Sequence, residues 1–158
     1  MASYVFDNAK LLLGTGQLKF DGGGPYRLAL MVDALKDEAQ YSGAKLWGEI
    51  KQFEISNPQY TPAPVNYESK EIMSVGITPS GDNYIVHGGD VKYPVATISA
   101  SYIVIVKGSN SFGNTMYDQD LLIEAIDIRG ANGLPAMSNN GVFSIKLGLS
   151  SGGFLIIK

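Results

Sequence analysis

The sequence contains no cysteine, which excludes disulfide bonds, a thiolate nucleophile and any cysteine-based metal site. It contains one histidine, His87, and a metal site usually needs three or more protein ligands. The N-terminal stretch MASYVFDNAK lacks the basic start and long apolar segment of a signal peptide. We therefore expect synthesis in the cytoplasm without export by that route, and we expect no metal ion or other cofactor.

Charge is sparse and the apolar runs are short. Charged residues make up 17% of the chain, the net charge is −3, and the twelve lysines and arginines are scattered. Nucleic-acid binding needs clustered basic residues, so we expect no nucleic-acid partner. The apolar run at 102–106 has five residues, and a membrane-spanning helix needs about twenty, so we expect no membrane partner. Low charge with nineteen glycines favours an assembly subunit, although a compact monomeric all-β domain explains it nearly as well.

The stretch ISASYIVIVKG at 98–108 predicts a strand that is covered on both faces. A strand with one face in water alternates apolar and polar residues, and this stretch stops alternating after Ser101. Either it lies centrally in a sheet, with the segment 4–13 or a second sheet on one face, or one face meets another chain.

Short strands account for most of the remaining pattern. Residues 4–13 have apolar side chains at helical spacing and predict a helix, which Ser3 caps and Gly14 ends. Residues 16–20 and 26–32, joined by the glycine-rich DGGGP, predict a hairpin. Further strands are expected at 51–56, 67–77, 84–87, 91–108 with a bend at Pro94, 121–130, 142–150 and 154–158, with polar loops at 109–120 and 131–141.

This pattern has eight to ten short strands, one clear helix and no βαβ alternation. It predicts a mainly β fold: an antiparallel β-sandwich or barrel with a short N-terminal α-helix, in a single domain over 1–158. Residues 33–50 are ambiguous and predict a short helix or an irregular excursion that carries Trp47.

The stretch NPQYTPAPVNY at 57–67 predicts an extended loop or arm, because its prolines bar it from a helix or an inner strand. Such an arm can lie across a neighbouring subunit, and an ordinary surface loop is an equally good interpretation. The residues predicted to contact a partner are Trp47, Tyr60, Pro62, Pro64 and Tyr67.

Residues that could carry out chemistry have simpler structural interpretations. His87 with Asp90 could supply a general base, but a histidine in a turn after a strand is favoured. Four acidic residues could suggest sugar hydrolysis or calcium binding, but a solvated strand edge is favoured. These acidic residues are Asp118, Asp120, Glu124 and Asp127. The glycine triplet at 22–24 is typical of a hairpin turn rather than a phosphate site.

The stretch VFDNAKLLLGTGQLKFDGGGPYRLALMV resembles the opening of a group of tailed-bacteriophage structural proteins. Those proteins open with an Asn-Ala-Lys-type helix that ends at glycine, followed by a strand, a turn and an Arg-x-Ala-Leu-Val strand. The matching positions are Asn8, Ala9, Lys10, Leu12, Gly16, Leu18, Arg27, Ala29, Leu30 and Val32. The stretches SYIVIVKGSNSFGNTMYDQD, LLIEAIDI and FSIKLGLSSGGFLII are similar to the same group. The resemblance covers roughly 4–32 and 95–158, and the chain departs from it over 33–94.

The resemblance implies a virion component without enzymatic activity. We expect a structural subunit of a tailed-phage virion, a capsid decoration or cement protein that forms a homo-oligomer and docks on the major capsid protein or another virion protein. The alternatives are a tail or head–tail connector component, or a carbohydrate- or receptor-binding module. That module would expose a row of aromatic residues, for which the candidates are Trp47, Tyr60, Tyr67 and Tyr117. A hydrolase that uses His87 with Asp90 or the acidic residues is a third, less favoured hypothesis.

Overall fold

The computed structural model describes residues 3–20, 25–60, 63–109 and 113–157. The strands are β1 (Tyr4–Val5), β2 (Tyr26–Met31), β3 (Lys70–Ile72), β4 (Gly76–Ser80), β5 (Asn83–His87), β6 (Val91–Ala100), β7 (Tyr102–Lys107), β8 (Leu121–Asp127), β9 (Ala136–Ile145) and β10 (Leu155–Ile157). The α-helices are α1 (Asp7–Gly14) and α2 (Glu38–Tyr41), and the 3₁₀ helices are η1 (Asp33–Lys36), η2 (Trp47–Glu49), η3 (Lys51–Phe53) and η4 (Leu149–Ser151).

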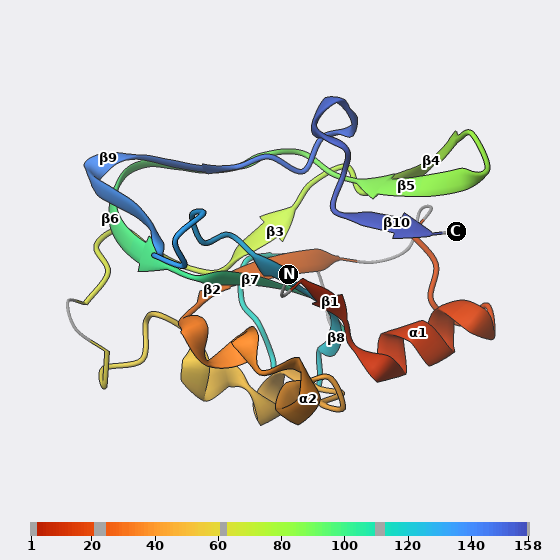
Figure 1. Ribbon diagram of the computed structural model, residues 1–158, viewed down its shortest axis with the longest axis horizontal. Coiled ribbons are helices and arrows are strands. Elements are labelled where there is room, and N and C mark those ends of the chain that lie inside the picture. The colour runs from red at the N-terminus through yellow and green to blue at the C-terminus, as the bar shows by residue number, and fades with distance from the viewer. Residues whose placement is uncertain (1–2, 21–24, 61–62, 110–112, 158) are drawn as a thin grey trace.

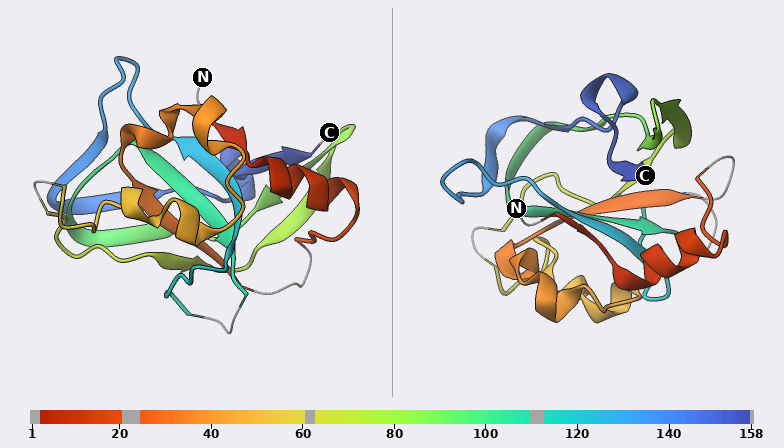
Figure 2. Two further views of the ribbon diagram at one scale, coloured as in Figure 1. Left: turned by 90° about the horizontal axis from the view of Figure 1, so that it is seen from below. Right: turned by 45° about the vertical axis from the view of Figure 1, so that its right-hand side comes forward.

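The described strands and helices stack in three layers (Figures 1 and 2). The middle layer is a five-stranded antiparallel sheet in the order β1-β8-β7-β2-β3. Above it in Figure 1 lie a three-stranded sheet, β10-β5-β4, and the two-stranded ribbon β6-β9. Below it lies the segment 33–57, which contains η1, α2, η2 and η3. The predicted mainly β, antiparallel fold is confirmed; it is sandwich-like, and the sheets do not close into a barrel.

Strand β7 explains why the sequence holds a continuous apolar run. It lies between β8 and β2 in the middle sheet. Ile103 and Ile105 pack into the upper core, whereas Tyr102, Val104 and Val106 pack into the lower core. Each of these five side chains is at most 2% exposed. The prediction of a strand covered on both faces is confirmed, and both covers belong to this chain.

The lower cover is the segment 33–57, which confirms the expected excursion around Trp47. Its side chains Leu35, Trp47 and Ile50 are buried against the middle sheet. The backbone N–H of Trp47 donates to the carbonyl oxygen of Asp120 at 2.9 Å, which ties the excursion to the chain just before β8. Burial of apolar side chains stabilises this layer, because its short 3₁₀ helices would not form alone.

The N-terminal helix is present but shorter than the predicted 4–13. Tyr4 lies opposite Ala125 in the β1–β8 pair, and α1 begins three residues later. Ser3 does not cap the helix; its Oγ accepts a hydrogen bond from the backbone N–H of Asp127 at 2.9 Å. The sheet edge therefore takes the first residues of the predicted helix, because pairing with β8 satisfies backbone groups that a helix end would leave open.

The predicted hairpin of 16–20 with 26–32 does not form. Residues 16–20 have no strand, although Leu18 and Phe20 are buried as their alternation indicated. Strand β2 pairs with β7 and β3 instead. Alternation correctly predicted which side chains are buried, but pairing was decided by strands far away in the sequence. The glycine turn at 22–24 lies outside the described residues.

Several predicted boundaries are also corrected. The strand expected at 51–56 is largely η3, and the strand expected at 67–77 is divided between β3 and the start of β4. The chain was expected to bend at Pro94, but it bends at Ser101, where β6 ends and β7 begins. Pro94 lies within β6 at a register shift, where the ladder does not need its missing N–H.

Strand β9 begins within the loop predicted at 131–141. Its first five residues, AMSNN, carry no strand pattern, and pairing with β6 makes them a strand. The ribbon curves downward at one end in Figure 1. Within β9, Asn140 has a φ of 52°, a conformation that asparagine tolerates. The predicted inward positions Phe143, Ile145 and Leu147 are buried, but Leu149 lies in η4 and is exposed.

None of the helices in the described ranges has the length and apolar character needed to cross a membrane.

Candidate docking surface

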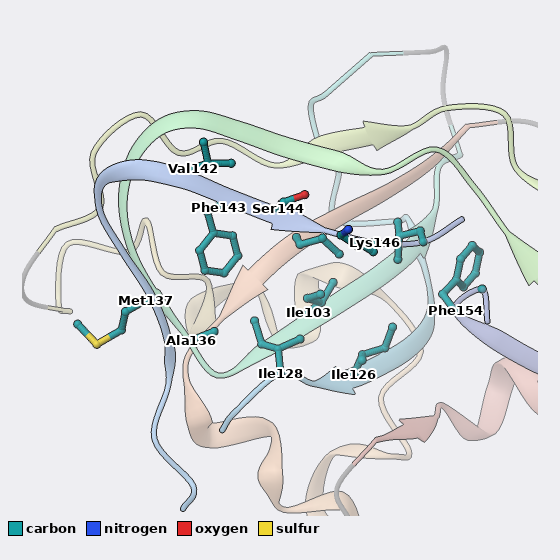
Figure 3. A pocket seen from close by; sticks show the side chains of 13 residues that line it. Ile103, Ile126, Ile128, Ala136, Met137, Val142, Phe143, Ser144, Lys146 and Phe154 are labelled. Carbon is teal, nitrogen blue, oxygen red and sulfur yellow. The ribbon is translucent and has the colours of Figure 1, made fainter. Parts of the chain in front are cut away.

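A groove of about 480 Å³ lies between β9 and the middle sheet (Figure 3). Phe143 points from β9 toward the sheet, and Ile103, Ile126 and Ile128 lie on the opposite wall. The alternation of β9 produces this wall, because it turns Phe143 and Ile145 inward while their neighbours face outward. The groove is therefore a gap between the two layers of the sandwich, and apolar side chains form most of its lining.

The rim of this groove is apolar and exposed. Met137 and Val142 of β9 are 73% and 61% exposed, and both line the groove. Ile126 and Ile128 on the opposite wall are half-buried. Exposed apolar groups that adjoin a concave apolar site mark surfaces that bind a partner more often than surfaces that stay in water. We call this surface, made by β9 and the groove beneath it, the β9 surface.

The lower face of the sheet buries an ion pair between Arg27 and Asp120. Nη1 of Arg27 lies 3.3 Å from Oδ2 of Asp120, and both side chains are at most 1% exposed. Asp120 also accepts hydrogen bonds from the backbone N–H of Ser109, its hydroxyl, and the N–H of Tyr117. Nε of Arg27 donates to the carbonyl oxygen of Gly113 at 2.7 Å. These bonds fasten the polar loop between β7 and β8 to β2, so the pair has a structural role.

The upper face buries a carboxyl group without such compensation. Glu124 lies opposite Ile105 on β8 and is 8% exposed. Its Oε2 atom has no hydrogen-bond partner among the described residues. Burial raises the pKa of Glu124 to about 8, because the charged form loses its hydration there.

His87 and Asp90 have different hydrogen-bond partners. Nε2 of His87 lies 2.9 Å from Oγ1 of Thr78 on the neighbouring strand β4. Oδ1 of Asp90 accepts from the backbone N–H groups of Leu147 and Gly148, which joins the turn after β5 to the end of β9. His87 is the last residue of β5 and lies opposite Gly76, so it belongs to the strand end and not to the turn that was predicted for it.

The four acidic residues do not converge on one site. Asp118 is exposed and pairs with Lys51 at 2.9 Å, while Asp127 pairs with Arg129 at 2.8 Å. The hydrogen bond from Arg129 lowers the pKa of Asp127. Asp120 and Glu124 are buried, so the interpretation as a solvated strand edge was wrong for these two residues. Across the described ranges, no three or more histidine or acidic side chains are grouped so that they could hold a metal ion.

Two of the predicted contact residues pack within this chain: Trp47 is buried and Tyr67 is half-buried. Trp47 is 4% exposed and belongs to the lower core. The hydroxyl of Tyr67 donates to Oε2 of Glu54 at 2.7 Å and accepts from the N–H of Leu30 at 2.9 Å. Burial, together with the charge of Glu54, raises the pKa of Tyr67 well above its ordinary value. The fold itself thus accounts for both aromatic residues.

Of the other predicted contact residues, two are half-buried and one lies outside the described residues. Tyr60 and Pro64 are half-buried and line a shallow pocket of about 310 Å³ with Ile55 and Ser99. Pro62 lies outside the described residues. The role of these residues in binding a partner stays a prediction, and Tyr60 is the residue that can test it without removing a core side chain.

The aromatic residues named for a carbohydrate-binding module do not form one exposed row. Trp47 is buried, Tyr60 and Tyr67 are half-buried, and Tyr117 is 40% exposed. The Arg27 guanidinium lies 5.8 Å from the centre of the Tyr117 ring. Tyr117 therefore belongs to the surroundings of the buried ion pair.

The β9 surface is the feature that sequence reasoning missed. The alternation at 142–150 correctly indicated Phe143 and Ile145 as inward residues, so one wall of the groove was visible in the sequence. Met137 fell within a predicted loop, and nothing in its neighbours signalled a strand. The opposite wall comes from β7 and β8, and its alignment with β9 is a property of the tertiary fold.

Comparisons with proteins of known family or structure do not assign this chain. No family model, no curated protein and no solved structure matches it. A functional assignment therefore depends on the residue pattern and on the surfaces described above.

Proposed function

We propose that this protein is a non-enzymatic structural subunit of a tailed-phage virion, synthesised in the host cytoplasm. It acts as a capsid decoration or cement protein that forms a homo-oligomer and docks on the major capsid protein or another virion protein. The observation that carries this proposal is the β9 surface, where Met137 and Val142 stand exposed beside an apolar groove. Such a surface suits a subunit whose neighbours cover it in an assembly.

The resemblance to phage structural proteins supports the same proposal through residues that build the fold. Ala9, Leu18, Ala29 and Leu30 are matching positions, and all four are buried. Arg27, another matching position, forms the buried ion pair. These buried positions support a shared architecture. They do not determine which partner is bound, because a partner contacts surface residues.

The test is co-sedimentation of the purified protein with phage particles that lack it, with separated heads and tails. Bound copies are counted by quantitative mass spectrometry. Saturable binding to heads at many copies is the expected result. Binding to tails, or to heads at a handful of copies, would replace the decoration role with a tail or connector role.

A matched pair of variants tests the predicted contact through the 57–67 loop. Tyr60→Ser should weaken binding to heads, whereas Tyr84→Ser, at a residue 50% exposed on β5, should leave it unchanged. Equal binding by both variants would remove Tyr60 from the docking surface. Absence of saturable binding to heads and tails by the unaltered protein would overturn the proposed function.

A further inference from the structure

The outer edge of β9 is open along a long strand. In the described part of the chain, β9 has ten residues and pairs with β6 along one edge and with no strand along the other. An open edge presents a row of backbone N–H and C=O groups that can pair with another chain.

The other sheet edges in the described ranges are short or blunted. Strand β1 has two residues, β3 and β10 have three each, and β4 contains Pro79. Strand β6 is as long as β9, but its outer edge carries Lys92 and Pro94. That edge is also covered, because Val65 and Thr97 exchange two backbone hydrogen bonds. Lysine, proline, short length and covering segments are the devices by which natural sheets prevent edge pairing.

Strand β9 carries neither a proline nor a charge. Its sequence is AMSNNGVFSI, and the first charged residue beyond it is Lys146. A neutral edge offers no charge pattern that would select a different protein, and it brings no like charges together when it meets its own copy. These features favour a second copy of this chain as the occupant.

We propose that the segment 141–145 of β9 pairs antiparallel with the same segment of a second copy about a two-fold axis. The two β6–β9 ribbons then merge into one four-stranded sheet, in which each incoming strand lies over the mouth of the other copy's groove. Pairing about a two-fold axis is the commonest symmetry of protein dimers. This inference deepens the homo-oligomer part of the proposed function, and it can fail while docking on particles stands.

The two-fold axis restricts the register. Side chains alternate between the faces of a strand, so identical strands can pair in this way only if one residue lies opposite its own counterpart. The charge of Lys146 disfavours an axis at that end, which leaves Val142, Phe143 or Ser144 as the central residue. Opposed residues in an antiparallel pair have Cα atoms about 4.5 to 5.5 Å apart, within the usual range for a disulfide.

The first experiment is sedimentation velocity on the unaltered protein and on a double variant, Val142→Lys with Ser144→Lys. Both side chains are exposed, so the fold should persist, as circular dichroism and thermal unfolding can confirm. The unaltered protein should be a dimer or a multiple of dimers. The double variant should be monomeric, with dimer dissociation raised on the order of a hundredfold, because like charges would face each other.

Two controls make the result specific. Ile156→Lys, on the exposed face of β10, should leave the dimer intact. Mixing the double lysine variant with Val142→Glu/Ser144→Glu should restore a heterodimer, because opposite charges then face each other. A monomeric unaltered protein, a dimer that survives the lysines, or failure of the mixed pair to associate overturns the inference.

A cysteine-free chain allows the register to be read by cross-linking. Under mild oxidation, a dimeric disulfide should form at Val142→Cys if residue 142 is central, and at Ser144→Cys if residue 144 is central. If Phe143 is central, the equimolar mixture of the two variants should cross-link instead. Absence of cross-linking in all three samples, or equal cross-linking at Ile156→Cys, would contradict the proposed pairing.

The outcomes keep the two proposals separate. A dimer that responds to these variants but binds neither heads nor tails supports the pairing and overturns the phage role. Saturable binding of a monomeric protein to heads overturns the pairing and supports the phage role.

Discussion

The two faces of the middle sheet bury charge and apolar surface in different ways. On the lower face, Arg27 meets Asp120 in a fully buried pair, and the core side chains are at most 5% exposed. On the upper face, Glu124 is buried with one oxygen unpartnered, and the half-buried Ile126 and Ile128 line an open groove. The same sheet therefore has one closed face and one face that is only partly covered.

The difference follows from the covers. The segment 33–57 is irregular, so it can follow the twisted sheet, and hydrogen bonds such as that from Trp47 to Asp120 hold it there. The β6–β9 ribbon is a paired two-stranded element that bends at one end, and a groove remains between β9 and the sheet beside β8. We infer that the lower face supplies most of the stability of the single chain, and that the upper face is available for assembly.

The largest expected effect is loss of the buried ion pair. Asp120→Ala should lower the free energy of unfolding by about 3 to 5 kcal/mol, because it removes the carboxylate that neutralises the buried Arg27 guanidinium. Asp118→Ala is the matched control, since its pair with Lys51 is exposed and should contribute no more than about 1 kcal/mol. Urea unfolding of both variants measures the difference. Equal losses of unfolding free energy in the two variants would show that the buried pair does not stabilise the fold more than the exposed pair does.

The next effect compares apolar truncations on the two faces. Leu35→Ala removes a side chain that is fully buried in the lower core and should cost about 2 to 5 kcal/mol. Ile128→Ala removes a side chain that already borders the groove and should cost about 1 kcal/mol, because less packing is lost. Urea unfolding in the monomeric Val142→Lys/Ser144→Lys background isolates the single chain. A larger loss of unfolding free energy for Ile128→Ala than for Leu35→Ala would contradict the inference that the lower face supplies most of the stability.

A third effect, smaller for each pH unit, is expected at Glu124. Its pKa is about 8 in the fold against 4.5 ordinarily, so the folded chain retains a proton that the unfolded chain releases. The free energy of unfolding should fall as pH rises from about 5 to about 8, by up to about 1.4 kcal/mol per pH unit from this group. Glu124→Gln should remove this contribution and be more stable than the unaltered chain at pH 9. An unchanged pH slope in urea unfolding would contradict the role of Glu124.

The smallest expected effect is removal of one hydroxyl. Tyr67→Phe keeps the ring but removes the hydrogen bonds with Glu54 and Leu30, and it should cost about 1 to 2 kcal/mol. Tyr84→Phe, at an exposed tyrosine, should be neutral in the same thermal unfolding measurement. If Tyr67→Phe is also neutral, the hydroxyl of Tyr67 does not hold the 57–67 loop to β2.

Local pattern was sufficient for the features that depend on burial alone. The run at 102–106 indicated a strand with two covered faces, and Phe143 with Ile145 indicated the inner side of β9. The excursion around Trp47 was also visible, because its glycines and helix-forming residues fit no strand. In each case, one short stretch carried the whole signal.

Pairing could not be predicted in the same way, because it joins distant segments. Residues 16–20 look like a strand, but β7 takes the place beside β2 that a hairpin would have given them. The role of Asp120 was hidden because its partner, Arg27, is 93 residues away. Trp47 and Tyr67 are aromatic residues in a loop-rich region, a pattern that fits a contact surface and an internal core equally well.

The pairing of β1 with β8 has a consequence for synthesis of the chain. Tyr4 precedes its partner Ala125 by 121 residues (125 − 4), so β1 is synthesised well before the strand with which it pairs. Before β8 is made, β1 has no strand with which to pair, and the middle sheet cannot be completed. Distant contacts of this kind slow folding, and closure of this edge of the sheet must follow synthesis of β8.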